Sequence, residues 1–521
     1  MNDGNGEIIG CSATGNVSAK GAWVGGLVGD NTGRIINSYA RSGVSGDRIV
    51  GGLVGSNGYI QRRDVYSESP GEIINSYSTG AVSGTSDVGG LVGLHEIGPV
   101  ISSFWDIQTS GQTKSAAGVG KTTGQMRDFQ TYLDAGWDLV GEIQNGTLEI
   151  WQMPPGGGYP ILSVFAGYTP PQLEGSGTPD DPYLVSNVIE LGAVVHCDPS
   201  AHYRLTASLD LSGIRWATAV VPLVEGSFDG NGHTISHLTI QGGSHLGLFG
   251  QVGSGAQVKN LGVVDVNIVG SSDYVGGLAA TNGGTVTGCY STGALRSGGS
   301  GRHYCIGGLI GSNSGAVIQG HSTATVTGTS SDVGGLVGGN GGSLSECYST
   351  GAVSATGEDV GGLAGSNRGT VTECYSTGTV STTGWDAGGL VGSNYGGVVT
   401  GCYSTGMVRG ASGVGGLVAW NTGTVSQCYS VGAVSGKSNV GGLVGSAFGG
   451  SVTACFWDTQ TSGQAASATG TGKTTAEMQT AKTFLDAGWD FVGETKNGTE
   501  DIWWIDEGKD YPRLWWEAAT E

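Results

Sequence analysis

Carboxylate side chains that could bind a cation or act as acid and base recur in this chain at a fixed spacing. Asp332, Asp359 and Asp386 lie 27 residues apart, each just before a Gly-Gly-Leu phrase. If each copy forms one coil of a stack, the carboxylates lie about 4.8 Å apart, and they repel unless they splay into water or share a calcium ion. We predict that they cap the turn, with calcium bridging and catalysis as the alternatives. Asp87 occupies this position in an earlier copy, whereas other copies hold Cys305, Gly413 and Asn439.

A second recurring set is aromatic, and it supplies the predicted ligand-binding residues. Its members are Tyr290, Tyr348, Tyr375, Tyr403 and Tyr429, with His321 at the same position in one copy. Each of these tyrosines follows a cysteine, and neighbours along a strand point to opposite faces, so buried thiols would place the rings outside. An outward row of rings could stack on sugars. The alternatives are that each ring packs on its neighbour, or that the two columns face the other way.

Two further columns indicate structure rather than chemistry. The first consists of Cys289, Cys347, Cys374, Cys402, Cys428 and Cys455, and the second of Asn282, Asn313, Asn340, Asn367, Asn394 and Asn421. In-register thiols are too far apart and too parallel for disulfides, so we predict buried, reduced cysteines. No zinc-ligand spacing occurs among them. The asparagines suit a left-handed turn, and each side-chain amide could bond to the amides above and below.

These columns belong to one repeating unit, which predicts the fold. A Gly-Gly-Leu-Val-Gly phrase, an Asn-bearing turn and a Cys-Tyr-Ser-Thr-Gly phrase return about every 27 residues. Within a repeat, segments 333–337, 344–350 and 353–354 read as three short strands broken by Gly and Asn. We therefore predict an all-β fold, a parallel β-helix (β-solenoid) of about 27-residue coils, with small α/β terminal caps.

A longer repetition predicts the domain boundaries. Segment 104–160 reappears without a gap at 456–512, and each copy directly follows the last repeat of an array, as a cap over an apolar end would. The predicted order is a truncated array at 1–103, its C-terminal cap at 104–167, a linker at 168–177, the lead-in of a second solenoid at 178–270, its repeat array at 271–455 and its cap at 456–521.

Capping-box spacings place the helices. The patterns Thr122-x-x-Gln125 and Thr474-x-x-Glu477 predict one short helix in each cap, followed by strands around Trp489 and at 503–504. The pattern that begins at Asn187 predicts another short helix.

Composition excludes several classes of function. The net charge of −21, with only 22 Lys and Arg scattered over 521 residues, argues against nucleic acid as a partner. No run reaches the roughly 20 apolar residues of a membrane span, and no signal peptide follows Met1. The chain opens in mid-repeat, so we interpret its N-terminus as the edge of a longer array, able to associate end to end.

The Gly-Leu-any-Gly phrases at 335–338 and 389–392, with their Cys-Tyr-Ser-Thr-Gly partners, resemble the GLUG repeat of bacterial secreted and cell-surface proteins, including some immunoglobulin A peptidases and adhesin-like chains. The resemblance covers 1–103 and roughly 245–455. It implies an extracellular or cell-surface module used as a stalk, adhesive surface or carrier. The zinc motif that the peptidases suggest is absent, because the sequence after His95 and Glu96 has Pro99 where the second histidine should stand.

The sequence therefore predicts a structural or adhesive β-solenoid without catalysis of its own, which binds polysaccharide or a host or neighbouring cell surface. The runner-up is a β-helix polysaccharide lyase or glycoside hydrolase. It is disfavoured because no local cluster of Asp with Arg or Lys is visible, the only adjacent pair being Asp180 and Asp181. A minor alternative is an ice-binding surface built from Ser-Thr columns such as those at 349–350 and 376–377. No cofactor other than calcium is expected.

Overall fold

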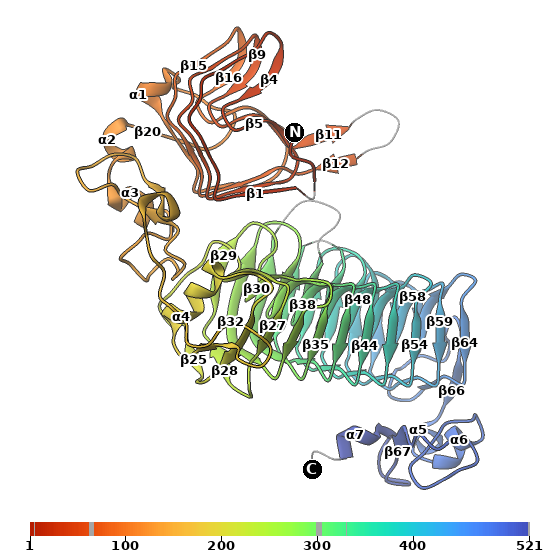
Figure 1. Cartoon of the computed structure of the whole chain (residues 1–521). Coiled ribbons are helices and arrows are strands. Elements are labelled where there is room, and N and C mark those ends of the chain that lie inside the picture. The colour runs from red at the N-terminus through yellow and green to blue at the C-terminus, as the bar shows by residue number, and fades with distance from the viewer. Residues whose placement is uncertain (5, 62–66, 299–304, 330, 519–521) are drawn as a thin grey trace.

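The computed structural model describes residues 1–4, 6–61, 67–298, 305–329 and 331–518, and the parts of the predicted domains at 5, 62–66, 299–304, 330 and 519–521 lie outside them. Short strands from successive coils stack in parallel register, as the sequence predicts. The chain forms a shorter stack near the N-terminus and a longer one that runs to the C-terminal cap (Figure 1). The β-solenoid prediction is confirmed.

One coil shows how the repeat folds. It contains β42 (Val333–Gly334), β43 (Val337–Asn340), β44 (Ser343–Ser345), β45 (Tyr348–Ser349) and β46 (Val353–Ala355). The prediction of three longer strands was therefore too coarse. The first predicted strand is broken by the corner at Gly335, and the second by Glu346, which is left-handed at φ 52°.

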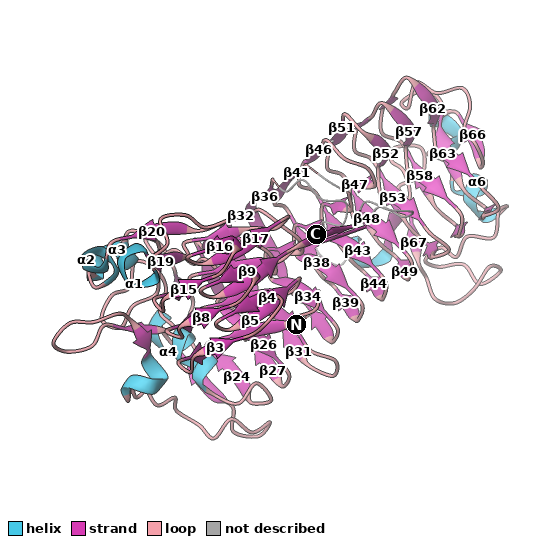
Figure 2. Ribbon diagram, turned by 90° about the horizontal axis from the view of Figure 1, so that it is seen from above, coloured by secondary structure: helices cyan, strands magenta, loops and turns pink. Residues whose placement is uncertain are grey.

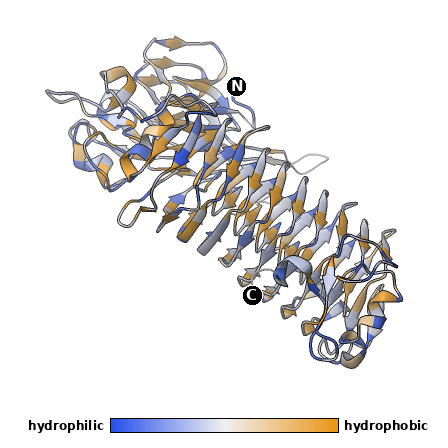
Figure 3. Cartoon of the chain, turned by 60° about the horizontal axis from the view of Figure 1, so that its bottom comes forward, coloured by the Kyte–Doolittle hydropathy of each residue, from blue (hydrophilic) through white to orange (hydrophobic). Residues whose placement is uncertain are grey.

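Equivalent strands of successive coils make four long faces in the second stack. The faces run from β23 (Tyr183–Val185) to β64 (Ser451–Thr453), from β26 (Val221–Val224) to β63 (Val444–Ala447), from β33 (Val275–Gly276) to β62 (Ser438–Gly441), and from β25 (Leu209–Asp210) to β66 (Thr471–Lys473). Apolar and polar residues alternate along the strands (Figure 3), so one face of each strand lines the core and the other faces outward.

The first stack repeats this plan with fewer coils. Its faces are β1 (Glu7–Ile9), β6 (Arg34–Ile36), β13 (Glu72–Ile74) and β18 (Val100–Ile101); β4 (Ala22–Gly25), β9 (Arg48–Gly51) and β16 (Ser86–Gly89); β5 (Val28–Asn31), β10 (Val54–Asn57) and β17 (Val92–His95); β3 (Val17–Ser18), β8 (Val44–Ser45) and β15 (Val82–Ser83); and β2 (Ser12–Ala13), β7 (Tyr39–Ala40), β14 (Tyr77–Ser78), β19 (Phe104–Asp106) and β20 (Val119–Lys121). An antiparallel hairpin, β11 (Tyr59–Gln61) with β12 (Ser67–Ser69), projects from it.

The Gly-Gly corner of each coil exists because of close packing. A Cβ on Gly334 would lie 2.0 Å from the Val337 carbonyl oxygen. A Cβ on Gly335 would lie 2.1 Å from the Gly362 carbonyl oxygen and 2.3 Å from Ser349 Oγ. Any side chain would push successive coils apart, and this explains why the phrase is repeated.

The core consists of apolar ladders, and the orientation of the cysteine column is now clear. The leucine after each Gly-Gly corner is fully buried, except for the half-buried Leu27 of the first stack, and Cys289, Cys347, Cys374, Cys402 and Cys428 are fully buried as well. All of these thiols are free, and the sulfurs bond weakly to main-chain carbonyls such as that of Ser345 at 3.1 Å from Cys347 Sγ. The prediction of buried, reduced thiols is confirmed, and the tyrosines that follow them point outward.

A ladder of side-chain amides runs through the turns, also as predicted. Each asparagine donates from Nδ2 to Oδ1 of the next, as from Asn313 to Asn340 and from Asn340 to Asn367, both at 2.8 Å. The side chains are buried, and each Nδ2 also reaches a turn carbonyl, so no amide is left unpaired along the ladder.

The caps close the stacks with one extra rung and then fold back along the side. In the second cap β65 (Phe456–Asp458) and β66 continue the sheet, and the Trp457 ring occupies the space above Gly442, where a Cβ would lie 2.0 Å from Trp457 Cδ1. Trp105 does the same over Gly90.

The helices of the caps follow. They are α1 (Ile107–Ser110), α2 (Thr123–Met126) and α3 (Phe129–Leu133) in the first cap, and α5 (Thr475–Met478), α6 (Ala481–Leu485) and α7 (Trp515–Ala518) in the second.

The predicted capping boxes are present at Thr122 and Thr474, and Asn187 caps α4 (Val188–Ala193). The prediction of a single helix in each cap was wrong, because the apolar stripe at 478–485 is split between α5 and α6 by a second helix start at Thr480. Trp503 begins strand β67 (Trp503–Trp504), whereas Trp489 lies outside any strand.

The two stacks lie side by side rather than end to end (Figures 1 and 2). The first cap contacts the start of the second stack directly. The Arg215 amide donates to the Gln144 carbonyl at 2.8 Å, and His196 Nε2, in the 3-10 helix η2 (Val194–His196), lies 2.9 Å from the Leu148 carbonyl oxygen. The predicted division into six segments stays a prediction.

Candidate functional site

The predicted tyrosines form one continuous stack on the outside of the second solenoid. Adjacent ring centroids are 4.6 to 5.1 Å apart, and the rings are nearly parallel, with interplanar angles of 3° to 8°, from Tyr290 through His321 to Tyr429. His321 continues the stack rather than interrupting it. Each ring face lies against the next ring, so the row presents ring edges and hydroxyls outward, which offers hydrogen bonding along its length rather than platforms for sugars.

The second cap covers one end of this stack. Tyr403 and Tyr429 are 5% and 1% exposed beneath Trp503, whereas Tyr290, Tyr348 and Tyr375 are half-buried. Trp516 of α7 lies over Tyr375, with 5.5 Å between the ring centroids. The predicted row is therefore more open before Tyr403, and Tyr403 and Tyr429 line only the pocket at the edge of the cap.

A pocket of about 290 Å³ remains where the stack enters the cap. Thr350, Thr377 and Thr405 line one side of it. The other side is charged: Glu517 accepts from the Tyr403 hydroxyl at 2.8 Å, and Arg513 donates to Asp510 at 2.5 Å. Burial raises the pKa of the Tyr375 phenol, which keeps it a neutral donor. We name this space the tyrosine pocket; it has the hydroxyl and charged groups that bind polar ligands.

The predicted aspartates stack on the neighbouring side of the solenoid. Asp332, Asp359 and Asp386 are all left-handed, with φ between 55° and 57°, and Gly413 and Asn439 take the same conformation in the next coils. The position thus requires a residue that tolerates positive φ.

The carboxylates are partly withdrawn from water. Asp359 is 8% exposed and accepts hydrogen bonds from the hydroxyls of Ser393 and Tyr395, the latter at 3.1 Å. Burial, reinforced by the charge of Asp359, raises the pKa of Asp332 to about 6 and that of Asp386 to about 7. Partial protonation therefore relieves the repulsion between stacked charges.

Within the described ranges, no group of three or more His, Cys, Asp or Glu side chains is arranged to hold a metal ion. The aspartates nevertheless offer a ladder of oxygens along the axis, so the calcium bridge at these positions stays a prediction.

The structure adds aromatic residues that the sequence analysis missed. Trp420 and Phe448 stack with ring centroids 4.2 Å apart, and Phe448 is 58% exposed. Tyr395 is 37% exposed, and Arg368 lies 4.8 Å above its ring. We call these four residues, with Asp359 and Asp386, the aromatic–acidic face.

Register ties this face to the aspartates. The strand position of Trp420 is occupied by Ser393 and Ser446 in the coils on either side. Ser393 bonds to Asp359, 34 residues earlier, and the same spacing places Trp420 beside Asp386. The signal in the sequence was therefore a departure from the repeat, a tryptophan in a column of serines.

A charged group that the sequence analysis considered absent lies at the start of the second stack. Arg204 Nε and Lys259 Nζ each lie 3.6 Å from Asp229 Oδ2. The three residues are register neighbours on β24 (His202–Leu205), β27 (Ser227–Asp229) and β31 (Gln257–Lys259), and they line a hollow of about 420 Å³. Residues 25 and 30 positions apart meet here only because the coils stack, so no local motif reveals them.

The Ser-Thr columns are divided between the inside and the outside. Ser349, Ser376 and Ser404 are fully buried, whereas Thr350 and Thr377 are exposed. The outer surface therefore presents only the threonine half of the hydroxyl array expected for ice binding.

Comparison with known proteins agrees with the repeat. The family model described as the GLUG motif matches residues 46–83, 356–381 and 383–409. The chain carries GLUG repeats, and the resemblance inferred from its Gly-Leu phrases is confirmed.

Curated relatives match only in part. Halomucin of Haloquadratum walsbyi is 36% identical over 167 residues, 29% of this chain and 2% of halomucin. A protein of Evansella cellulosilytica, described as a candidate Gly-rich membrane protein, is 33% identical over 137 residues, 24% of this chain and 15% of that protein. The chain thus corresponds to a small fraction of the length of each.

Among solved structures, a candidate immunoglobulin A1 protease from Bacteroides ovatus is similar at a TM-score of 0.36 and 19% identity, over 66% of this chain and 94% of that one. In the part of this chain that the structure describes, no helix has the length and apolar character needed to cross a membrane.

Proposed function

We propose that this chain is an extracellular or cell-surface β-solenoid module that binds polysaccharide through its aromatic–acidic face. The exposed Trp420–Phe448 pair carries the proposal. Trp420 interrupts a column in which the neighbouring coils carry serine. Phe448 shares its position in the coil with Arg368 and Tyr395 and is 58% exposed.

The chemistry of the face suits sugars. Apolar ring faces stack on the C–H surface of a pyranose, and carboxylates with a guanidinium accept from and donate to its hydroxyls. Arg368, Tyr395 and Phe448 lie on successive or alternate coils, so an extended chain lying along the axis would meet several of them. The names of the relatives, a mucin and a candidate membrane protein, also fit a surface role.

The test is a glycan array with two variants whose new residues come from the same columns. Trp420→Ser introduces the residue found in the coils on either side, and Phe448→Thr introduces the residue found at 422. We expect the double variant to keep its melting temperature and to lose at least tenfold in affinity for the glycan bound by the wild type. Trp23→Asn, at an exposed tryptophan on β4 of the first stack, is the control.

Binding that survives the double variant would remove the aromatic–acidic face from the proposal. It would leave the tyrosine pocket and the open part of the row beside it, where Tyr375→Phe and Tyr348→Phe together remove two hydroxyls and keep the ring stack. A triple alanine variant of Tyr348, Tyr375 and Tyr403 would be less informative, because Tyr403 is buried under the cap and its loss would disturb packing.

The Asp229 group favours a second candidate, a β-helix enzyme acting on polysaccharide. A carboxylate flanked by two cations in an open hollow could bind and activate a sugar chain. Release of reducing ends or unsaturated sugars by the wild type and not by Asp229→Asn would support this candidate. Without such release the chain is a binding module.

A further inference from the structure

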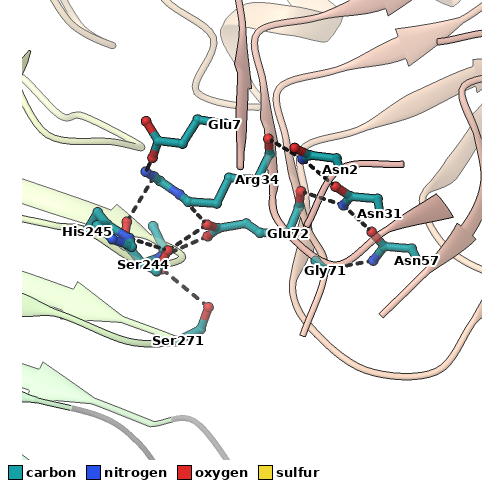
Figure 4. Close-up of polar contacts among 11 residues, drawn as sticks. Asn2, Glu7, Asn31, Arg34, Asn57, Gly71, Glu72, Ser244, His245 and Ser271 are labelled. Carbon is teal, nitrogen blue, oxygen red and sulfur yellow. Dashed lines mark hydrogen bonds and ion pairs between the residues drawn. The ribbon is translucent and has the colours of Figure 1, made fainter. Parts of the chain in front are cut away.

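The two stacks meet through a buried charged contact (Figure 4). Glu7, Arg34 and Glu72 are register neighbours on β1, β6 and β13, and Arg34 donates to both carboxylates. Glu72, only 4% exposed, also accepts from the Ser244 amide at 2.8 Å and from Ser244 Oγ at 2.6 Å. Arg34 donates in turn to the Ser244 carbonyl at 3.2 Å. These bonds fix the separation between the stacks.

Open space lies on both sides of this contact. One cavity of about 390 Å³ and another of about 580 Å³ share Glu7, Arg34, His245 and Gln251 in their walls. Because four wall residues are common, the two spaces are halves of one cleft between the stacks. Each half has the volume of a small-molecule site.

The halves differ in chemistry. The first is lined mainly by apolar side chains from the first cap and from both stacks, among them Ile36, Leu148, Leu162, Val164 and Leu223. Ile36, Leu148 and Leu162 are buried and form the floor of this half, whereas Val164 is 69% exposed. The second is lined by hydroxyls and amides, among them Thr32, Ser272, Thr281, Asn282 and Ser312.

The ionisable groups in the walls are already paired or neutral. Arg34 is balanced by two carboxylates, and the bonds to Glu72 occupy its oxygens. Burial lowers the pKa of His245 to about 3, so its ring is neutral. Burial and the charge of Glu72 raise the pKa of Asp273 to about 7. No cation in the cleft lacks a partner carboxylate among these wall residues, so a charged head group gains little there.

We propose that the cleft between the two stacks binds an amphiphile with an alkyl chain and an uncharged, hydroxylated head, the chemistry of a glycolipid or alkyl glycoside. The alkyl chain lies in the apolar half, beside Val164 and Leu162, and the head meets the hydroxyls beside Thr281. This site is separate from the aromatic–acidic face, and it stands whether or not that face binds polysaccharide.

The experiment is calorimetric titration of the full chain with octyl β-D-glucoside below its critical micelle concentration. We expect saturable binding at one site, at least tenfold weaker for methyl β-D-glucoside, which lacks the chain. Octanoate and octylammonium carry the same alkyl chain with a charge, and we expect each to bind at least tenfold more weakly than the glucoside.

Val164→Trp is the variant that fills the apolar half. Position 164 corresponds to Trp516 in the second cap, so this scaffold already accommodates tryptophan there. We expect a tenfold loss of octyl glucoside binding, and a smaller loss for Thr281→Val in the polar half. Val398→Trp, at a surface valine outside the cleft, is the control and should bind like the wild type.

Absence of saturable binding, equal binding of octanoate or octylammonium, or binding unchanged in Val164→Trp would each overturn the proposal. Loss of glycan binding by the aromatic–acidic face would not affect these results, so the two proposals fail independently.

Discussion

The two caps are copies of one sequence segment, yet their contacts with the tyrosine row beneath them differ. In the first, Arg41 donates to the Tyr77 hydroxyl at 2.8 and 3.0 Å and to the carbonyls of Tyr159 and Pro160. Its guanidinium also lies 4.9 Å above the Tyr39 ring. In the second, Thr405 stands at the equivalent position and lines the tyrosine pocket. Arg41 therefore fills the space that Thr405 leaves open. The charged wall of the pocket also differs, because Asp510, Arg513 and Glu517 correspond to Gly158, Ile161 and Phe165 in the first cap.

Other contacts between the cap and the tyrosine row are the same in the two copies. Tyr77 and Tyr429 both donate to the carbonyl of the proline at the cap's return, Pro160 or Pro512. The first cap has Arg41 in place of the pocket-lining Thr405 and still adopts the same fold. The open pocket is therefore not required for the cap to fold.

The largest effect is expected where the caps are identical. Gly90→Ala and Gly442→Ala each place a Cβ about 2.0 Å from the indole of Trp105 or Trp457. Because the tryptophan is wedged in the core, we expect each change to cost about 3 kcal/mol or more. Denaturant unfolding of each cap region, followed by tryptophan fluorescence, measures it. A loss in only one copy would show that the caps do not close their stacks in the same way.

Exchanging Arg41 and Thr405 tests the difference itself. Arg41→Thr removes several charge-assisted hydrogen bonds and should destabilise the first stack by about 2 kcal/mol. Thr405→Arg should cost little stability and fill the tyrosine pocket, and Thr350→Ser is its control at a neighbouring wall position. Equal melting temperatures for Arg41→Thr and wild type would contradict the structural role of Arg41.

Removing a single tyrosine hydroxyl should lower the free energy of unfolding by different amounts in the two caps. Tyr77→Phe loses the bond to Pro160 and two bonds from Arg41, whereas Tyr429→Phe loses the bond to Pro512. We expect about 2 kcal/mol for the first and about 1 kcal/mol for the second. Chemical denaturation of both variants provides the measurement, and the reverse order would contradict the contacts described.

The smallest effect concerns pH, and it contrasts the aspartates of the two arrays. Asp386 keeps its proton to about pH 7 in the folded chain but loses it near pH 4 when unfolded. The folded state therefore binds more protons between these values, and stability falls as pH rises through this window. Asp386→Asn should remove about 1 kcal/mol of this fall, after allowance for solvent screening.

Asp87 of the first array is the matched control, because it is exposed and its register neighbours are not carboxylates. Melting curves from pH 4 to pH 8 compare the Asp386→Asn variant with Asp87→Asn, for which we expect no such change. The same series with added calcium tests the cation alternative: stabilisation at pH 8 that is lost in the Asp332, Asp359 and Asp386 triple Asn variant supports a metal, and its absence removes that alternative.

The fold could be predicted because the same residue types recur at the same positions in successive coils. Glycines that permit close approach, leucines that fill the core and asparagines that bond along the axis each recur in register, so one pattern is confirmed many times. The buried thiols followed from the same geometry.

The candidate sites were harder to predict because they depend on exceptions. Trp420 differs from the serines around it, and the group around Asp229 forms only when separate coils stack. The cleft between the stacks depends on the docking of segments about 200 residues apart, which no periodicity reports. The tyrosine row was predicted from the sequence, with packing of each ring on its neighbour as one alternative. The 5.0 Å between the ring centroids of Tyr348 and Tyr375 shows that the ring faces pack on one another.

The asparagine ladder has a direction. Every amide donates toward the C-terminal end, from Asn282 through Asn394 to Asn421, which then donates to the Gly423 carbonyl. The first array runs the same way, from Asn2 to Asn57, whose Nδ2 lies 3.2 Å from Nδ1 of His95. Aligned amide dipoles add, as they do in a helix. Each solenoid therefore carries a net dipole along its axis, built from uncharged amides, with an amide acceptor at one end and an amide donor at the other. A coil added in the reverse orientation could not continue this chain of hydrogen bonds.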